Sequence, residues 1–151
     1  MGRWLGIDHG TKRMGVAVGG TEDGVATPVA AVAAEPAAAA LEKIRELAAE
    51  YDVEGIVVGW PLNMDDSEGP QGVLAREAAV RLAEAAGLDV RLWDERLSSF
   101  AADQALAGSY TRKQKALRQD AVAAAAMLRD FLTSDGPARA PRADEIGDSG
   151  G

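Results

Sequence analysis

Acidic side chains at three separate places in the sequence are the first candidates for chemistry. Asp8 follows the apolar run at 3–7, and the pair Asp94 and Glu95 follows the run at 88–93. Each run predicts a buried strand with carboxylates at its carboxyl end. A carboxylate there must be hydrogen-bonded, paired or bound to a metal, because removing it from water is costly.

A third acid, Asp120, interrupts an apolar stripe that is typical of a helix packed on a core. The stripe recurs at helical spacing and consists of Leu117, Ala121, Ala124, Met127, Leu128 and Phe131. The alanines around Asp120 would let this helix approach the sheet closely. A simpler interpretation pairs Asp120 with Lys113 or Arg118 on its own helix, but three acids that could converge favour a shared metal site.

Three carboxylates without thiolates or several histidines suit hard cations, so the expected ions are Mg²⁺ or Mn²⁺. Two such ions can activate a water and stabilise the leaving oxygen in the hydrolysis of a phosphodiester bond. Bound cations also invert the local charge. The formal net charge of −8 therefore does not exclude a nucleic-acid substrate.

The strands and helices that must position these acids are predicted from the spacing of apolar residues, which changes along the chain between the strand and the helix pattern. The predicted order is a three-stranded meander, then helix, strand, helix and strand, and finally two helices. This order predicts an α/β fold with one mixed five-stranded sheet, three antiparallel strands followed by two parallel ones, flanked by helices. Pro28 in the third strand suggests an edge position or a bulge. The expected strands are 3–8, 14–18, 25–32, 54–59 and 88–93, and the expected helices are 36–51, 71–86, 98–106 and 112–132.

Length and composition indicate one domain over 1–133 and a disordered tail over 134–151, where Gly, Pro, Ala and charges show no periodicity. The chain has no cysteine and no run long enough to span a bilayer, so we expect a cytoplasmic protein. A basic run at 112–118 reads equally as a solvated helix face or a phosphate contact.

Four motifs, taken together, resemble the YqgF (RuvX) family of small ribonuclease H-like proteins. Members of this family are described as Holliday junction resolvases and as nucleases that mature the 5′ end of the small-subunit ribosomal RNA precursor. The resemblance covers residues 3 to about 132 and implies the ribonuclease H-like three-layer fold. The motifs are Asp8-His-Gly-Thr-Lys-Arg-Met-Gly-Val-Ala, Gly59-Trp-Pro-Leu-Asn-Met-Asp65, Asp94-Glu-Arg-Leu-Ser-Ser99 and Asp120-Ala-Val-Ala-Ala.

By position, the resemblance implies Asp8, Glu95 and Asp120 as the catalytic, metal-binding acids. Asp94 competes with Glu95 for its role, since neighbouring residues of a strand point to opposite faces. His9 is either a proton relay or, the preferred interpretation, a packed side chain. The expected contacts with nucleic acid are Lys12, Arg13, Asn63, Arg96, Lys113, Lys115 and Arg118.

The expected substrate is a ribosomal RNA precursor, and branched DNA is the alternative. A junction resolvase would be a homodimer, whereas an RNA-processing enzyme could act as a monomer. A non-catalytic RNA-binding factor for ribosome assembly is a third possibility. The Asp-x-Gly-Thr signature also occurs in sugar kinases and actin-like ATPases, but these need two such domains, and this chain is too short for them.

Overall fold

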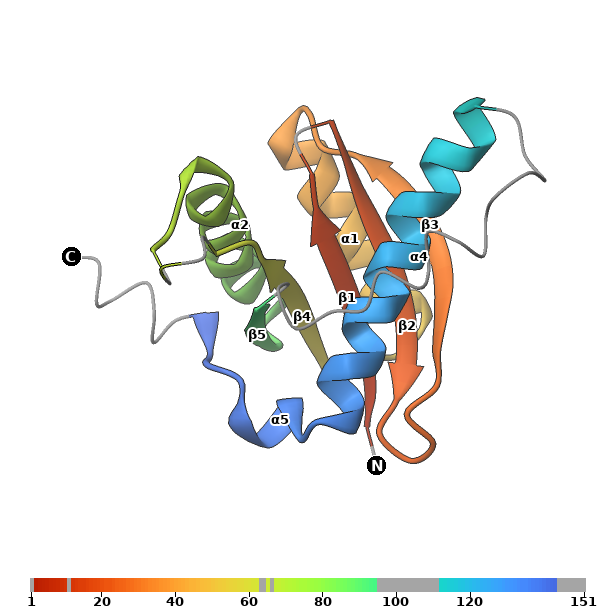
Figure 1. Ribbon diagram of the computed structural model, residues 1–151, viewed down its shortest axis with the longest axis vertical. Helices are drawn as coiled ribbons and strands as arrows, with labels where there is room; N and C mark the ends of the chain where they lie inside the picture. The colour runs from red at the N-terminus through yellow and green to blue at the C-terminus, as the bar shows by residue number, and fades with distance from the viewer. Residues whose placement is uncertain (1, 11, 63–64, 66, 95–111, 144–151) are drawn as a thin grey trace.

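The computed structural model of the chain describes residues 2–10, 12–62, 65, 67–94 and 112–143, and it describes only the backbone of 112–119. In this part of the chain five strands form one sheet in the order β3-β2-β1-β4-β5 (Figure 1). The pairs β1–β2 and β2–β3 are antiparallel, and β1–β4 and β4–β5 are parallel. The predicted mixed sheet is therefore confirmed. Its strands are β1 (Arg3–His9), β2 (Arg13–Gly20), β3 (Ala26–Ala33), β4 (Gly55–Trp60) and β5 (Asp89–Asp94).

Helices cover both faces of the sheet and make a three-layer structure (Figure 1). The helices α1 (Ala37–Glu50) and α2 (Pro70–Ala86) pack on one face, and α4 (Arg112–Thr133) packs on the other, followed by the short α5 (Gly136–Arg139). The helix expected at 98–106 lies outside the described residues. Among the described helices, none is long and apolar enough to cross a membrane.

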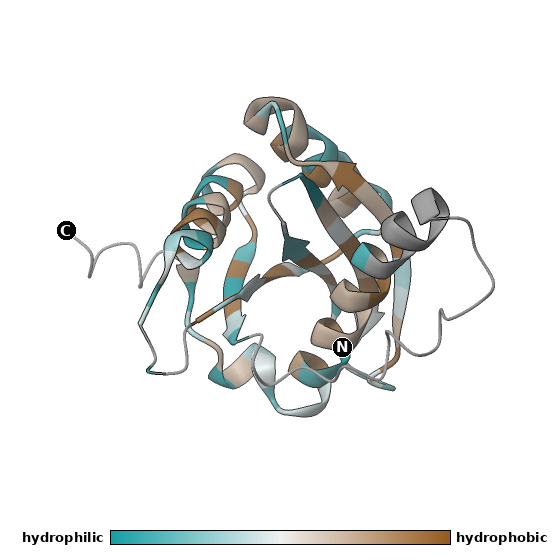
Figure 2. Cartoon of the chain, turned by 45° about the horizontal axis from the view of Figure 1, so that its top comes forward, coloured by the Kyte–Doolittle hydropathy of each residue, from teal (hydrophilic) through white to brown (hydrophobic). Residues whose placement is uncertain are grey.

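Alternation along the strands sorts the side chains into two cores. Leu5 and Ile7 of β1 join the core beneath α1 and α2, whereas Trp4 joins the core beneath α4. The central strand β4 is buried over Gly55–Gly59, as its continuous apolar run predicts. Figure 2 shows the hydrophobic stretches that the strands contribute to these layers.

The expectations for Pro28 are both met. Its strand, β3, lies at the edge of the sheet, where a missing backbone N–H costs no ladder bond. The register with β2 also shifts there, since Ala30 lies opposite Val16 while Pro28 lies opposite Ala17. Pro28 therefore lies both in an edge strand and at an irregularity of the ladder.

Close approach of α4 to the sheet depends on two glycines. A Cβ atom added to Gly15 of β2 would overlap the backbone carbonyl oxygen of Asp120, and one added to Gly6 of β1 would lie 2.9 Å from the Cβ of Leu128. The helix presents small side chains to the sheet over this stretch, and Ala121 and Ala124 are buried. The expectation of a closely packed, alanine-rich helix is confirmed.

The expectation of a disordered tail from residue 134 does not hold for 136–143. The Arg91 guanidinium donates to the carbonyl oxygen of Ala140 at 2.7 Å, and the backbone N–H of Leu92 donates to the carbonyl oxygen of Pro141 at 3.0 Å. Ala140 and Ala143 are buried in the two different cores. The segment lacks hydrophobic periodicity because it packs as an irregular strip along the free edge of β5. Residues 144–151 lie outside the described part.

We predict that Gly15→Ala destabilises the protein, because the added methyl group forces α4 away from β2. Overpacking of this kind costs about 1–3 kcal/mol. Chemical denaturation of the two proteins measures the difference. Gly20→Ala on the same strand is the matched control, because its Cβ would meet nothing closer than an oxygen at 3.8 Å. Equal losses in both variants would contradict the close contact.

Candidate functional site

Asp8 lies near the carboxyl end of β1 and is half-buried. Alternation places its side chain on the same face as Trp4 and Gly6, which is the face covered by α4. Among the described residues, its carboxylate has no hydrogen-bond or ion-pair partner. A half-buried carboxylate with open lone pairs is suited to bind a cation.

Asp120 lies on the same side of the sheet, close to Asp8 in the fold. Gly15 is the register partner of Asp8 across the β1–β2 ladder, and the backbone of Asp120 passes directly over Gly15. The two acids thus flank one glycine, although 112 positions separate them in the sequence. The structure brings these two predicted site residues together at the end of the sheet where β1 turns into β2.

Among the described side chains, Asp120 pairs with Arg13 of β2; the side chains of Lys113 and Arg118, the partners considered on its own helix, lie outside the described part. The Arg13 Nε donates to Asp120 Oδ2 at 2.7 Å, with 107 positions between the two residues. Both side chains are partly open to solvent, at 39% and 30% exposed. The pair is therefore a contact between strand and helix that sequence periodicity could not show.

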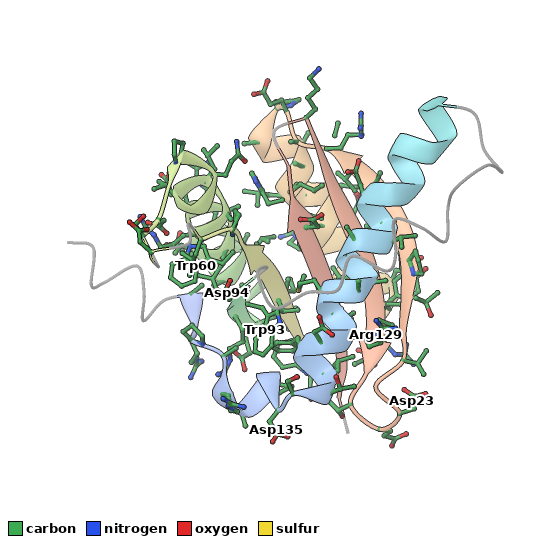
Figure 3. The ribbon with its side chains drawn as sticks, in the orientation of Figure 1. Asp23, Trp60, Trp93, Asp94, Arg129 and Asp135 are labelled. Atoms are coloured by element: carbon green, nitrogen blue, oxygen red, sulfur yellow. The ribbon has the colours of Figure 1, made fainter. Side chains whose placement is uncertain are left out.

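The carboxyl ends of the parallel strands lie at the same edge of the sheet as Asp8. Ile7 of β1 aligns with Val58 of β4, which aligns with Leu92 of β5. Trp93 belongs to the core under α4, whereas Leu92 belongs to the opposite core, so alternation assigns Asp94 to the face away from Asp8. Figure 3 shows Trp60, Trp93 and Asp94 gathered around the ends of β4 and β5.

The other predicted contacts with nucleic acid fall into three groups. Lys12 is exposed in the turn between β1 and β2, beside Arg13. Asn63, Glu95 and Arg96 lie outside the described residues. The basic residues Lys113, Lys115 and Arg118 lie on the first turns of α4, where only the backbone is described, on the same helix as Asp120.

The loop that follows β4 is held by Glu68, a residue that was not predicted to be part of the site. Glu68 accepts a hydrogen bond from Trp60 Nε1 at 2.9 Å, and it pairs with Arg76 Nε of α2 at 2.9 Å. Hydrogen bonding from Arg76 lowers the pKa of Glu68. The available signal was the indole of Trp60, a donor that usually finds an acceptor when partly buried. Glu68 therefore ties both ends of this loop to the fold.

His9 follows Asp8 directly but faces the other side of the sheet. It lines a cavity of about 280 Å³ between β1, β2, α1 and α2, together with Met14 and Leu74. Its Nδ1 is buried without a hydrogen-bond partner among the described residues, and burial lowers the pKa of His9. Its position fits the packed interpretation and removes it from the face where a proton relay for Asp8 would have to lie.

The residues present fit a hard divalent cation in their chemistry. Asp8 and Asp120 offer carboxylate oxygens on one face, and Asp8 has no competing partner among the described residues. Among the described residues, no group of three acids, histidines or cysteines is close enough to hold a metal ion. A third ligand would therefore come from outside them, and Glu95, the predicted one, lies there.

The lowered pKa of His9 predicts a pH dependence of stability. The unfolded chain regains the ordinary value of 6.5, so it binds more protons than the folded chain just below that pH. Stability should therefore be complete above about pH 6.5 and fall as the pH drops below it. Urea unfolding at about pH 7.5 and pH 5.5 measures this loss, which should be smaller in His9→Gln than in the wild type. The same loss in both proteins would contradict the lowered pKa of His9.

Comparison with solved structures shows which known fold this chain shares. The chain is similar to "T. thermophilus RuvC in complex with Holliday junction substrate", with a TM-score of 0.54 and 20% sequence identity. The match covers 93% of this chain and 98% of the other. The ribonuclease H-like fold implied by the sequence is thus confirmed.

Comparison with known sequences shows the family. A protein of Geobacillus thermodenitrificans named "Putative pre-16S rRNA nuclease" is 42% identical over 137 residues, which cover 87% of this chain and 98% of that protein. A protein of the same name from Opitutus terrae is 41% identical over 145 residues, covering 95% and 99%. The family model described as "RuvX: Holliday junction resolvase" matches residues 2–134. Because this match takes in all five strands and α4, the chain belongs to the RuvX family.

Proposed function

We propose that this chain is a metal-dependent nuclease of the cytoplasm that hydrolyses phosphodiester bonds in the ribosomal RNA precursor, at the 5′ end of 16S rRNA. The observation that carries the proposal is the placement of Asp8 and Asp120 on either side of Gly15, at the edge where β1, β4 and β5 end. The names of relatives more than 40% identical support the RNA substrate.

Asp8, Asp120 and, as the third ligand, Glu95 would hold Mg²⁺ or Mn²⁺. Two ions bound there would supply an activated water and stabilise the leaving oxygen. The assignment of Glu95 over Asp94 is supported by alternation in β5, which turns Asp94 to the other face.

Positive side chains around the acids would bind and orient the phosphates. Lys12 and Arg13 lie at the β1–β2 turn, next to Asp8. Lys113, Lys115 and Arg118 would extend the contact along α4, with Asn63 and Arg96 contributing from the loops after β4 and β5. This local charge offsets the net charge of −8, which would otherwise repel a polyanion.

Junction resolution in DNA is the second candidate function. It is favoured by the description of the matching family model and by the fold shared with RuvC, which was solved on a Holliday junction. A resolvase must cut two strands symmetrically, so it would act as a homodimer. An RNA-processing enzyme has no such requirement and could be a monomer.

We predict that Asp8→Asn and Asp120→Asn each lower cleavage by about 100-fold or more, because groups that only support metal ligands already cost about 10- to 100-fold when they are lost. The assay offers purified full-length protein a 5′-extended 16S rRNA precursor and a four-way DNA junction in parallel, with Mg²⁺ or Mn²⁺ and with a chelator. We expect metal-dependent cleavage of the RNA by the wild type. Cleavage of the junction alone would instead support the second function.

Asp23→Asn is the matched control, because Asp23 lies in the β2–β3 turn at the other end of the sheet and accepts a bond from the backbone of Val25 at 3.0 Å. It should cleave like the wild type. Thermal unfolding of all variants separates lost chemistry from lost folding. Full activity in Asp8→Asn would contradict the assigned site, and RNA binding without cleavage by the wild type would support a non-catalytic assembly factor.

A further inference from the structure

Arg13 and Asp120 form an ion pair inside the proposed site. The guanidinium engages Oδ2 of Asp120 through Nε at 2.7 Å. Arg13 stands at the first position of β2, and alternation puts it on the same face as Gly15, over which Asp120 passes. A cation of the chain itself therefore occupies a carboxylate that the proposed metal ions need.

The ion pair between Arg13 and Asp120 can break at little cost in free energy. Its side chains are 39% and 30% exposed, so water and salt screen the attraction, and pairs of this kind contribute little net stability. A divalent cation on Asp120 would both compete for the carboxylate and repel the guanidinium. The released guanidinium would stand beside the site with five N–H donors, in a fork that matches the oxygens of a phosphate group.

We propose that Arg13 is a positioning residue that exchanges partners. It pairs with Asp120 while no divalent ion is bound, and it turns to a phosphate of the nucleic acid once an ion takes the carboxylate. The inference rests on the proposed function, because it takes Asp120 as a metal ligand. Its consequence is coupling: metal binding makes Arg13 available to substrate, and by linkage substrate favours metal binding to the same extent.

The first test measures Mn²⁺ affinity of the full-length protein without nucleic acid, by electron paramagnetic resonance of free Mn²⁺. Arg13→Gln should bind Mn²⁺ about two- to fivefold more tightly than the wild type, since the competing cation is gone. Arg13→Lys keeps a competing charge and should retain the wild-type affinity. Arg45→Gln is the matched control, because Arg45 also pairs with an acid, Glu42, at 3.1 Å on the remote helix α1, and it should change nothing.

The second test measures coupling with a short phosphorothioate oligonucleotide, which resists cleavage, by fluorescence anisotropy with and without Mn²⁺. The gain in oligonucleotide affinity on adding Mn²⁺ should be smaller in Arg13→Gln than in the wild type and in Arg45→Gln. Circular dichroism melts confirm that the variants fold.

The outcomes separate this inference from the function on which it rests. If the wild type binds no Mn²⁺, the metal site itself is wrong, and the exchange falls with it. If the wild type binds Mn²⁺ and Arg13→Gln binds it equally or more weakly, the metal site stands but the exchange is wrong. Arg13 then only docks α4 or holds Asp120 ready for the ion.

Discussion

The packing of α4 on the strand pair β1–β2 is the constraint on which the rest of the structure depends. At Gly15 the helix backbone comes so close that no side-chain atom fits between, and one turn later the buried Ala124 keeps its carbonyl oxygen 3.4 Å from a Cβ added to Gly6. This contact sets the height of Asp120 over the sheet and hence its place beside Asp8. A larger side chain at the crossing would increase the separation of the two acids, so packing and chemistry depend on the same small residues.

Adjacent side chains of β1 point to opposite faces of the sheet, where their environments differ. Asp8 faces α4, the ion pair of Arg13 with Asp120 and solvent, whereas His9 faces an apolar cavity between α1 and α2. A carboxylate on the open side keeps access to cations. On the other side, burial lowers the pKa of His9, because it disfavours the charged form. Two consecutive residues of β1 therefore face the polar site and the opposite core, respectively.

Two polar contacts hold the segments around β4 and β5, the strands at the other end of the sheet edge that carries the site. Glu68 joins the indole of Trp60 to Arg76, so the chain leaving β4 is tied back to α2. Arg91 reaches the carbonyl oxygen of Ala140, and the C-terminal segment covers the free edge of β5. An edge strand covered in this way is protected from pairing with other chains. In both contacts a charged side chain forms hydrogen bonds to partly buried groups. These bonds hold the chain next to β4 and β5 without adding to the hydrophobic core.

The helices, the strands and the kinds of residue in the site follow from local sequence patterns. Strand and helix periods are local properties, so β1, β2, α2 with its end at Gly87, and the stripe of α4 were predictable from neighbouring residues. Which side chains meet depends instead on how those elements pack in the folded chain. Arg13 pairs with Asp120 across 107 positions, Asp94 takes the face away from Asp8, and 136–143 packs despite having no periodicity. Such contacts are set by the register of strands and the crossing of a helix, which no short stretch of sequence contains.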